Sequence, residues 1–182
     1  MQDYYTKWIM CFPSETKSEL DTFEALNLFS LPGEVMRLYS DNALEISKAA
    51  KAMKWRHDKC TPNRSPTNGV AEQAVRRVLD GTRSVLFRSG FPLRWWAEAS
   101  KCFCYLRNCV DIIRDGKTAY ELRFDEPCPF TGSKAVEFGS AIHYLPSSRK
   151  EKDEREKFES RAVPGLFVGY ASYAGADGRA TT

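Results

Sequence analysis

The stretch TPNRSPTNGVAEQAVRR, residues 61–77, decides the fold of this chain. Its first nine residues contain two prolines, two asparagines and a glycine, which favour turns over regular structure. From Val70 onward, apolar residues recur at helical spacing as far as Leu86, so we predict a loop followed by a long helix. This arrangement puts the carboxylate of Glu72 in the first helical turn and Arg76 one turn later on the same face.

A second carboxylate, Asp41, stands at the end of a short β-prone run. Residues 35–39 predict a strand, and the small residues after Asp41 predict a turn. Taken alone, Asp41 is typical of a turn or a helix cap, and Glu72 is typical of a solvated acid near a helix start. Taken together, they predict a site for a hard cation, with arginines beside it that suit a phosphate backbone.

The rest of the chain predicts alternating strands and helices. Gly81, inside the long predicted helix, costs about 1 kcal/mol relative to alanine and predicts a bend there. The other expected elements are a strand at 5–12, a helix capped by Ser14 or Thr16 and ending near Phe29, a helix at 43–53, an extended piece at 55–60, a helix from Trp95 to Val110, a linker at 111–135, a β-like piece at 136–146, a solvated loop at 147–160, and a turn with a strand at 162–170.

The composition is that of a folded domain with a modest positive charge. The 182 residues are 42% hydrophobic and 13% aromatic, which excludes a disordered chain, and the net charge is only +3. The charge is concentrated locally, because residues 76–94 hold five arginines against the single acid Asp80: Arg76, Arg77, Arg83, Arg88 and Arg94. We predict that this helix contacts nucleic acid; the alternative is a solvated helix face on which the arginines pair with Asp80 and other acids.

Cysteine and histidine usage argues against a zinc site. The six cysteines form no CxxC pair and the two histidines are isolated, so four suitably spaced ligands are lacking. We expect reduced, buried thiols at Cys102, Cys104 and Cys109. The sequence has no positively charged leader before an apolar run and no apolar stretch of membrane-spanning length, so we expect an intracellular protein without a membrane partner.

Five segments resemble the integrase cores of copia-type LTR retrotransposons, and they occur in the same order as in that family. YSDNALE (39–45) is similar to the strand-end aspartate segment, and TPNRSPTNGVAEQAVRRV (61–78) to the loop and helix that carry the glutamate. DYYTKWIMCFPSETKSELDTFEAL (3–26) resembles the strand–helix unit before that aspartate, and FPLRWWAEASKCFCYLRN (91–108) the tryptophan-bearing helix after the core. FGSAIHYLPSSRK with KFESRAVPGLFVGY (138–150 and 157–170) resembles the small β module that follows.

The resemblance implies an α/β, ribonuclease-H-like core that lacks its first strand or strands, followed by a small β-rich module. We expect a partial catalytic core at 1–110, a linker at 111–135 and the β-rich module at 136–182. The activity that the resemblance implies is metal-dependent DNA strand transfer in the nucleus by a multimer, with Mg²⁺ or Mn²⁺ held by Asp41 and Glu72 and no small-molecule cofactor. DNA would be contacted by the arginines Arg76, Arg77 and Arg83, and by the loop residues Arg64 and Asn68.

The sequence also departs from the family pattern. Integrases hold two cations about 3.5–4 Å apart with three carboxylates, and we identify only Asp41 and Glu72. Asp3 belongs by alignment to a hairpin turn and does not replace the first aspartate. The spacing between Asp41 and Glu72 is shorter than usual, and Gln73 stands where arginine is common. We therefore expect no integration by this polypeptide alone; a catalytically inactive binding module, a degraded retroelement fragment and a nuclease of the same fold are the alternatives.

Overall fold

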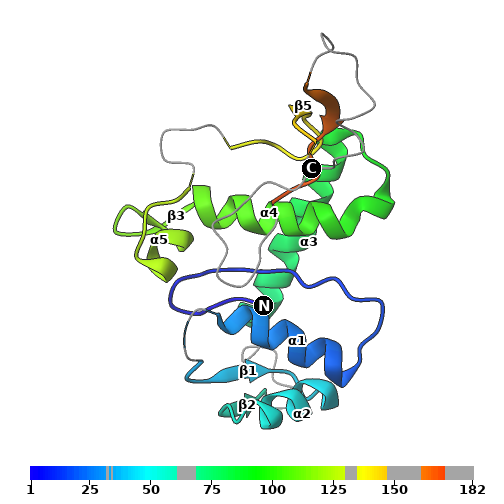
Figure 1. Ribbon diagram of the computed structural model, residues 1–182. Helices are drawn as coiled ribbons and strands as arrows, with labels where there is room; N and C mark the ends of the chain where they lie inside the picture. Colours follow the sequence, from blue (N-terminus) through cyan, green and yellow to red (C-terminus); the bar gives the residue numbers. More distant parts are fainter. Residues whose placement is uncertain (32, 34, 61–68, 130–134, 147–160, 171–182) are drawn as a thin grey trace.

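The structure is a computed structural model that describes residues 1–31, 33, 35–60, 69–129, 135–146 and 161–170 (Figure 1). Helices and short strands alternate along these segments, as the sequence predicts. The elements are α1 (Glu19–Ser30), β1 (Leu38–Ser40), α2 (Leu44–Ala52), β2 (His57–Lys59), α3 (Gly69–Ser89), the 3₁₀ helix η2 (Leu93–Trp95), α4 (Trp96–Val110), β3 (Ile112–Arg114), β4 (Lys117–Thr118), α5 (Ala119–Phe124), β5 (Ala141–Tyr144) and β6 (Val163–Leu166).

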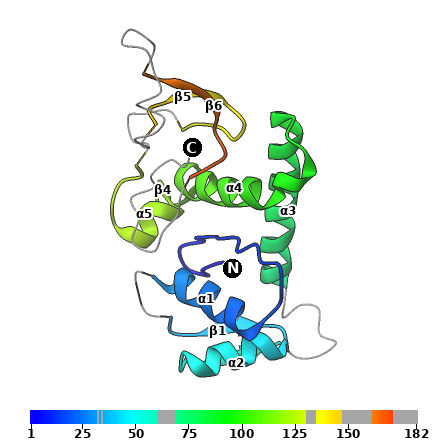
Figure 2. The ribbon, with the colours of Figure 1, turned by 45° about the vertical axis from the view of Figure 1, so that its right-hand side comes forward.

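The strands β1 and β2 form a parallel pair joined by α2, which is a βαβ unit. Leu38 lies opposite His57, and Ser40 lies opposite Lys59. Helix α1 packs beside α2, and the two helices lie on the same side of the molecule as the strand pair (Figures 1 and 2). Because the carboxyl ends of parallel strands meet at one edge, the unit delivers the residue after β1, Asp41, to that edge.

The long helix α3 and the buried helix α4 cross at a glycine. Figure 1 shows α4 lying across α3, with the N-terminal half of α3 extending toward the βαβ unit. A Cβ atom built on Gly81 would lie 2.1–2.5 Å from three ring atoms of Phe103 on α4, a clash that only glycine avoids. The predicted bend at Gly81 does not interrupt the helix, which continues from Gly69 to Ser89.

Residues 112–124, inside the predicted linker, form a hairpin and a short helix. Asp115 and Gly116 both adopt positive φ, 52° and 74°, as the tight turn between β3 and β4 requires. Helix α5 starts with a capping box, in which the Thr118 hydroxyl accepts from the Glu121 N–H and the Glu121 carboxylate accepts from the Thr118 N–H. Because Ala119 and Tyr120 are buried in the same cluster as Cys109 of α4, this segment packs into the core.

The main core is built around α4 and reaches both ends of the described chain. Trp8, Cys102 and Tyr105 pack in one cluster with Phe167 and Tyr170. Phe167 and Tyr170 come directly after the antiparallel pair β5–β6, so the end of this segment shares a core with α4. The limits of the three predicted domains stay a prediction. Among the helices in the described part of the chain, none is both long and apolar enough to cross a membrane.

The strand predicted at residues 5–12 is wrong. These residues follow a tight turn, and their pairing with the start of the chain is a single bridge between Gln2 and Ile9. The backbone of Ile9 is satisfied instead by a side chain, because the buried Asn108 amide accepts from the Ile9 N–H (3.0 Å) and donates to the Ile9 carbonyl (2.8 Å). Asn108 of α4 therefore takes the place of a neighbouring strand.

Two expected boundaries also differ from the structure. Helix α1 is capped by Ser18, whose hydroxyl accepts from the Asp21 N–H at 3.0 Å, and not by Ser14 or Thr16. The last strand, β6, is Val163–Leu166, so it covers only the first part of the turn and strand predicted at 162–170. The predicted solvated loop at 147–160 lies outside the described residues.

The contact at Gly81 makes a test of the α3–α4 crossing. Helix propensity alone predicts that Gly81→Ala stabilises the protein by about 1 kcal/mol. Overpacking against Phe103 costs about 1–3 kcal/mol, and we expect it to outweigh the gain, so that Gly81→Ala lowers the melting temperature.

The matched control is Gly69→Ala at the start of the same helix, where a Cβ meets no atom within 4 Å. This variant should melt at the wild-type temperature or above. A Gly81→Ala protein that melts higher than wild type would contradict the close crossing.

The buried thiols of α4 make stability fall at alkaline pH. Burial raises the pKa of Cys102 and of Cys104 from 9.0 to about 12. Because these folded-state pKa values lie above the unfolded ones, the stabilisation is fully present below pH 9 and is lost as the pH rises toward 12. Urea unfolding at successive pH values should show a decline of about 1.4 kcal/mol per pH unit for each thiol in that window.

The variant Cys104→Ala removes one ionising thiol, so the unfolding free energy should fall by about 1.4 kcal/mol per pH unit less than in wild type. An unfolding free energy that stays level from pH 9 to pH 11 would show that the thiols are not buried as described.

Candidate functional site

An open pocket of about 690 Å³ lies between the end of β1 and the N-terminal half of α3. It brings together four of the predicted site residues: Asp41, Glu72, Arg76 and Arg83. The strand end supplies the first carboxylate, and successive turns of α3 supply the second carboxylate and both arginines. The other lining residues are Tyr39, Ser40, Ile46, Ala71, Val75, Leu79 and Asp80.

A short chain of hydrogen bonds holds the turn that carries Asp41. The Ser40 hydroxyl donates to the Asp41 carbonyl oxygen at 2.8 Å and lies 2.9 Å from Nε2 of His57 on β2. The Ser40 hydroxyl therefore links the Asp41 backbone, directly after β1, to the His57 ring on β2. The Asp41 carboxylate caps the next turn, because Oδ1 accepts from the Ala43 N–H at 3.3 Å.

Glu72 and Arg76 occupy the exposed face of α3 that borders the pocket. Glu72 lies in the first turn, where backbone N–H groups favour negative charge. Val75 and Leu79 line the same pocket and are 58% and 50% exposed. The site therefore combines charged groups on α3 with apolar side chains that remain open to solvent.

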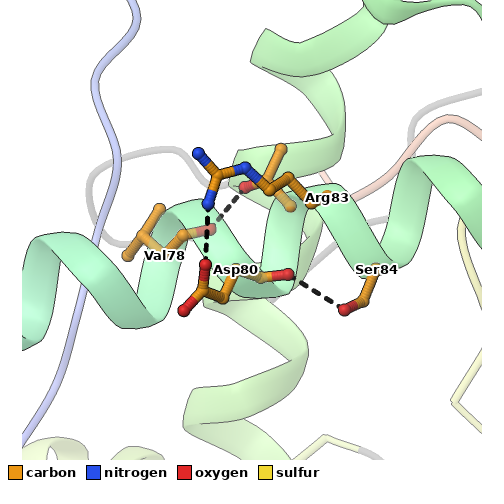
Figure 3. Close-up of polar contacts among 5 residues, drawn as sticks. Val78, Asp80, Arg83 and Ser84 are labelled. Carbon is orange, nitrogen blue, oxygen red and sulfur yellow. Dashed lines mark hydrogen bonds and ion pairs between the residues drawn. The ribbon is translucent and has the colours of Figure 1, made fainter.

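Arg83 reaches back along the helix to Asp80. Its Nη1 atom lies 2.8 Å from Asp80 Oδ1 (Figure 3). This ion pair supports the alternative that Arg83 belongs to a solvated helix face on which it pairs with Asp80. Both side chains are largely exposed, so the ion pair contributes little to stability and Arg83 can leave it. In contrast, Arg76 forms no ion pair with another residue in the part of the chain that the structure describes.

A further predicted nucleic-acid contact, Arg77, does not line the pocket. It acts electrostatically on Arg107 of α4 instead. A step of one residue turns a helix by about 100°, so Arg76 and Arg77 point to different neighbours. Arg64 and Asn68 lie outside the described residues.

The pocket offers oxygen ligands of the type that Mg²⁺ and Mn²⁺ prefer. The carboxylates of Asp41 and Glu72 fit a hard cation by chemistry, and Asp41 uses Oδ1 for the turn. Asp80 adds a third carboxylate to the pocket lining, but it is paired with Arg83. Across the residues that the structure describes, no group of three or more histidine, cysteine, aspartate or glutamate side chains is close enough to hold a metal ion.

Sequence reasoning missed part of this site. Asp80 was assigned only to the solvated helix face, although its position one turn before Arg83 puts it on the pocket side of α3. The support of Asp41 by Ser40 and His57 depends on the register of β1 and β2, which the sequence alone does not specify. The apolar residues Val75 and Leu79 fit the helical spacing, but that spacing does not show that they line the pocket.

Known proteins resemble the chain in sequence and in fold. No protein-family model matches it. Over 149 residues it is 28% identical to the retrovirus-related Pol polyprotein from transposon TNT 1-94 of Nicotiana tabacum; the match covers 75% of the chain and only 10% of that polyprotein. This similarity confirms the resemblance to the integrase core of an LTR retrotransposon that the sequence motifs indicate.

Two solved structures also match the chain. A chain of the simian T-cell lymphotropic virus intasome in complex with PP2A regulatory subunit B56 gamma matches 96% of this chain and 62% of its own length, with a TM-score of 0.56 and 15% identity. The catalytic core domain of BIV integrase matches 62% of this chain and 74% of its own length, with a TM-score of 0.45 and 20% identity. The intasome chain confirms the ribonuclease-H-like fold.

Proposed function

We propose that this chain, which resembles the integrase core of an LTR retrotransposon, is a DNA-binding protein whose helix α3 contacts the phosphate backbone beside a divalent-cation site. One observation carries the proposal: a single pocket brings Asp41 and Glu72 together with Arg76 and Arg83. Carboxylates that bind a cation and guanidinium groups that bind phosphate are complementary when both face the same strand of DNA.

The arginines of α3 are the primary DNA contacts. A guanidinium group offers donors in a fork that matches two phosphate oxygens, and such contacts position DNA without reading its sequence. Arg76 has no described ionic partner to give up, whereas Arg83 must leave Asp80. We therefore expect Arg76 to contribute more affinity than Arg83.

The cation would be Mg²⁺ or Mn²⁺, held by Asp41 and Glu72. When bound, such an ion activates and stabilises oxygen atoms during phosphoryl transfer. The chain's own contribution is to orient the two carboxylates, through the turn at Asp41 and the first turn of α3. Two carboxylates suit one cation rather than a pair, so we propose that the polypeptide alone does not catalyse strand transfer.

The relatives support a proposal for the setting of this activity. The chain spans a tenth of the length of the Pol polyprotein that it matches, and its structural relative comes from a viral intasome. We propose that the chain likewise acts on DNA in the nucleus, as part of a multimer. A DNA-binding role that does not involve a cation is the competing function, and the dependence of DNA affinity on Mg²⁺ distinguishes the two.

Replacing Arg76 tests the DNA contact. Arg76→Ala should weaken binding to a labelled duplex uniformly across sequences and reduce the slope of log affinity against log salt by about 1. Fluorescence anisotropy at several salt concentrations measures both quantities.

The control is Arg94→Ala, which removes an equal charge from the 3₁₀ helix η2, away from the pocket. Its effect on the slope should be smaller. If both variants bind like wild type, or if both lose the same affinity, the pocket is not the DNA contact.

Replacing Glu72 tests the cation and the proposed lack of catalysis. Glu72→Gln should remove any effect of Mg²⁺ on duplex affinity, because it deletes one of two ionised ligands. It should raise affinity slightly in EDTA, since a negative charge facing phosphate is lost. Strand transfer should be absent from both proteins, so strand transfer by the wild type that Glu72→Gln abolishes would refute this part of the proposal.

A further inference from the structure

A rigid turn at the start of the chain displays two tyrosines. The Asp3 N–H donates to the Trp8 carbonyl at 2.8 Å, and Asp3 Oδ1 accepts from both the N–H and the hydroxyl of Thr6, at 2.6 and 2.8 Å. These bonds fix the turn between them. The side chains at its tip, Tyr4 and Tyr5, are 76% and 64% exposed. Two adjacent aromatic rings that are held in place and left in solvent can stack against the bases of a nucleic acid.

A cation lies over each of these rings. Lys7 Nζ is 4.2 Å from the ring centroid of Tyr4, and Arg114 Cζ is 4.7 Å from that of Tyr5. Arg114 ends β3, so two turns distant in the sequence meet at this point. Figures 1 and 2 show the N-terminal segment passing beneath α4, on the side of β3–β4 and α5. Each ring has one face over a cation, which leaves the opposite face for a ligand.

Helix α4 anchors the turn. Arg107 Nη1 donates to the Lys7 carbonyl at 3.4 Å, and Asn108 binds the backbone of Ile9. The Arg107 side chain is only 9% exposed, so it supports the turn from beneath and leaves Lys7 and Arg114 as the cations beside the two rings.

The acidic residues near the turn do not cancel its charge. Asp3 is turned inward to Thr6 and lies in the field of Arg123, and Asp111 pairs with Arg107 at 3.5 Å. Asp115, at the β3–β4 turn, is exposed. Within the described part of the chain, Lys7 and Arg114 form no ion pair. They remain able to bind an anion.

We propose that Tyr4 and Tyr5, with Lys7 and Arg114, form a binding surface for single-stranded nucleic acid. Exposed aromatic rings interleaved with cations bind single strands, because bases stack on the rings while the cations contact phosphates. Bases inside a duplex are already stacked on one another, so the two tyrosines select unpaired bases. This surface is separate from the pocket of Asp41, Glu72 and Arg76, and it does not depend on the duplex contact proposed there.

The test compares a double variant, Tyr4→Ser with Tyr5→Ser, against a matched control, Tyr4→Phe with Tyr5→Phe. The probes are a fluorescein-labelled oligothymidylate, an abasic strand of the same length and a duplex, each bound to the full chain and followed by anisotropy. We expect the serine variant to bind oligothymidylate at least about 30-fold more weakly than wild type, since it removes both rings on which bases stack. The phenylalanine variant keeps both rings and should stay within about twofold of wild type.

The abasic strand separates stacking from charge. Wild type should bind it weakly, and the serine variant should bind it equally weakly. Arg114→Ala should weaken the binding of both single strands. It should leave the melting temperature of the protein unchanged, because the Arg114 side chain is exposed.

Three results would overturn the inference: undetectable binding of oligothymidylate by wild type, unchanged binding by the serine variant, or an equal loss on the abasic strand. The last result would mean that the tyrosines contact the strand without stacking on its bases. Duplex affinity should be the same in the serine variant and in wild type. A chain that fails to bind duplex but binds oligothymidylate through the tyrosines refutes the proposed function and leaves this inference standing.

Discussion

The close approach of α3 and α4 at Gly81 sets the geometry on which the rest of the structure depends. Because the Phe103 ring occupies the space of a side chain at position 81, α4 lies directly against α3. This contact leaves the N-terminal half of α3 free to extend beyond α4 toward the βαβ unit (Figure 1). Glu72 and Arg76 lie on that half, so the packing of two helices carries them to the edge where β1 delivers Asp41.

The same crossing gives adjacent arginines of α3 different neighbours. Arg76 lines the pocket with the two carboxylates, whereas Arg77 does not line it and acts electrostatically on Arg107 of α4. Adjacent positions on a helix point about 100° apart, which explains the difference. Arg76 is therefore the arginine of this pair that lies beside the candidate cation site. Cysteines and aromatic residues of α4 belong to the main core.

The sequence was sufficient for the features whose signals are local. The helical period after Val70 identified α3, and the turn-rich loop before it put Glu72 in the first turn. Asp41 was recognised from a β-run followed by small residues, and the structure places both acids at one pocket. The hairpin and helix inside 111–135 also carry local signals, which are Asp115-Gly116 at the turn and the Thr118–Glu121 capping box.

The remaining features depend on contacts between distant residues. The strand expected at 5–12 failed because the partner of Ile9 is not a strand but the amide of Asn108, 99 residues away. Likewise, the sequence reads Gly81 as a weak point of a helix, and only the position of Phe103 shows why glycine is required there. The support of Asp41 by His57 requires the parallel register of β1 and β2. Such pairings follow from the folded arrangement and not from periodicity or spacing.

The central claim is that Asp41 and Glu72 belong to one cation site beside the α3 arginines. The most direct measurement is a Mn²⁺ titration followed by backbone amide NMR, because a bound paramagnetic ion broadens the signals of nearby residues. We expect broadening to begin together at Asp41 and at Glu72, and Mg²⁺ in excess to reverse it. Broadening at only one of the two segments, or first at other exposed acids such as Glu126 and Asp125, would contradict a shared site.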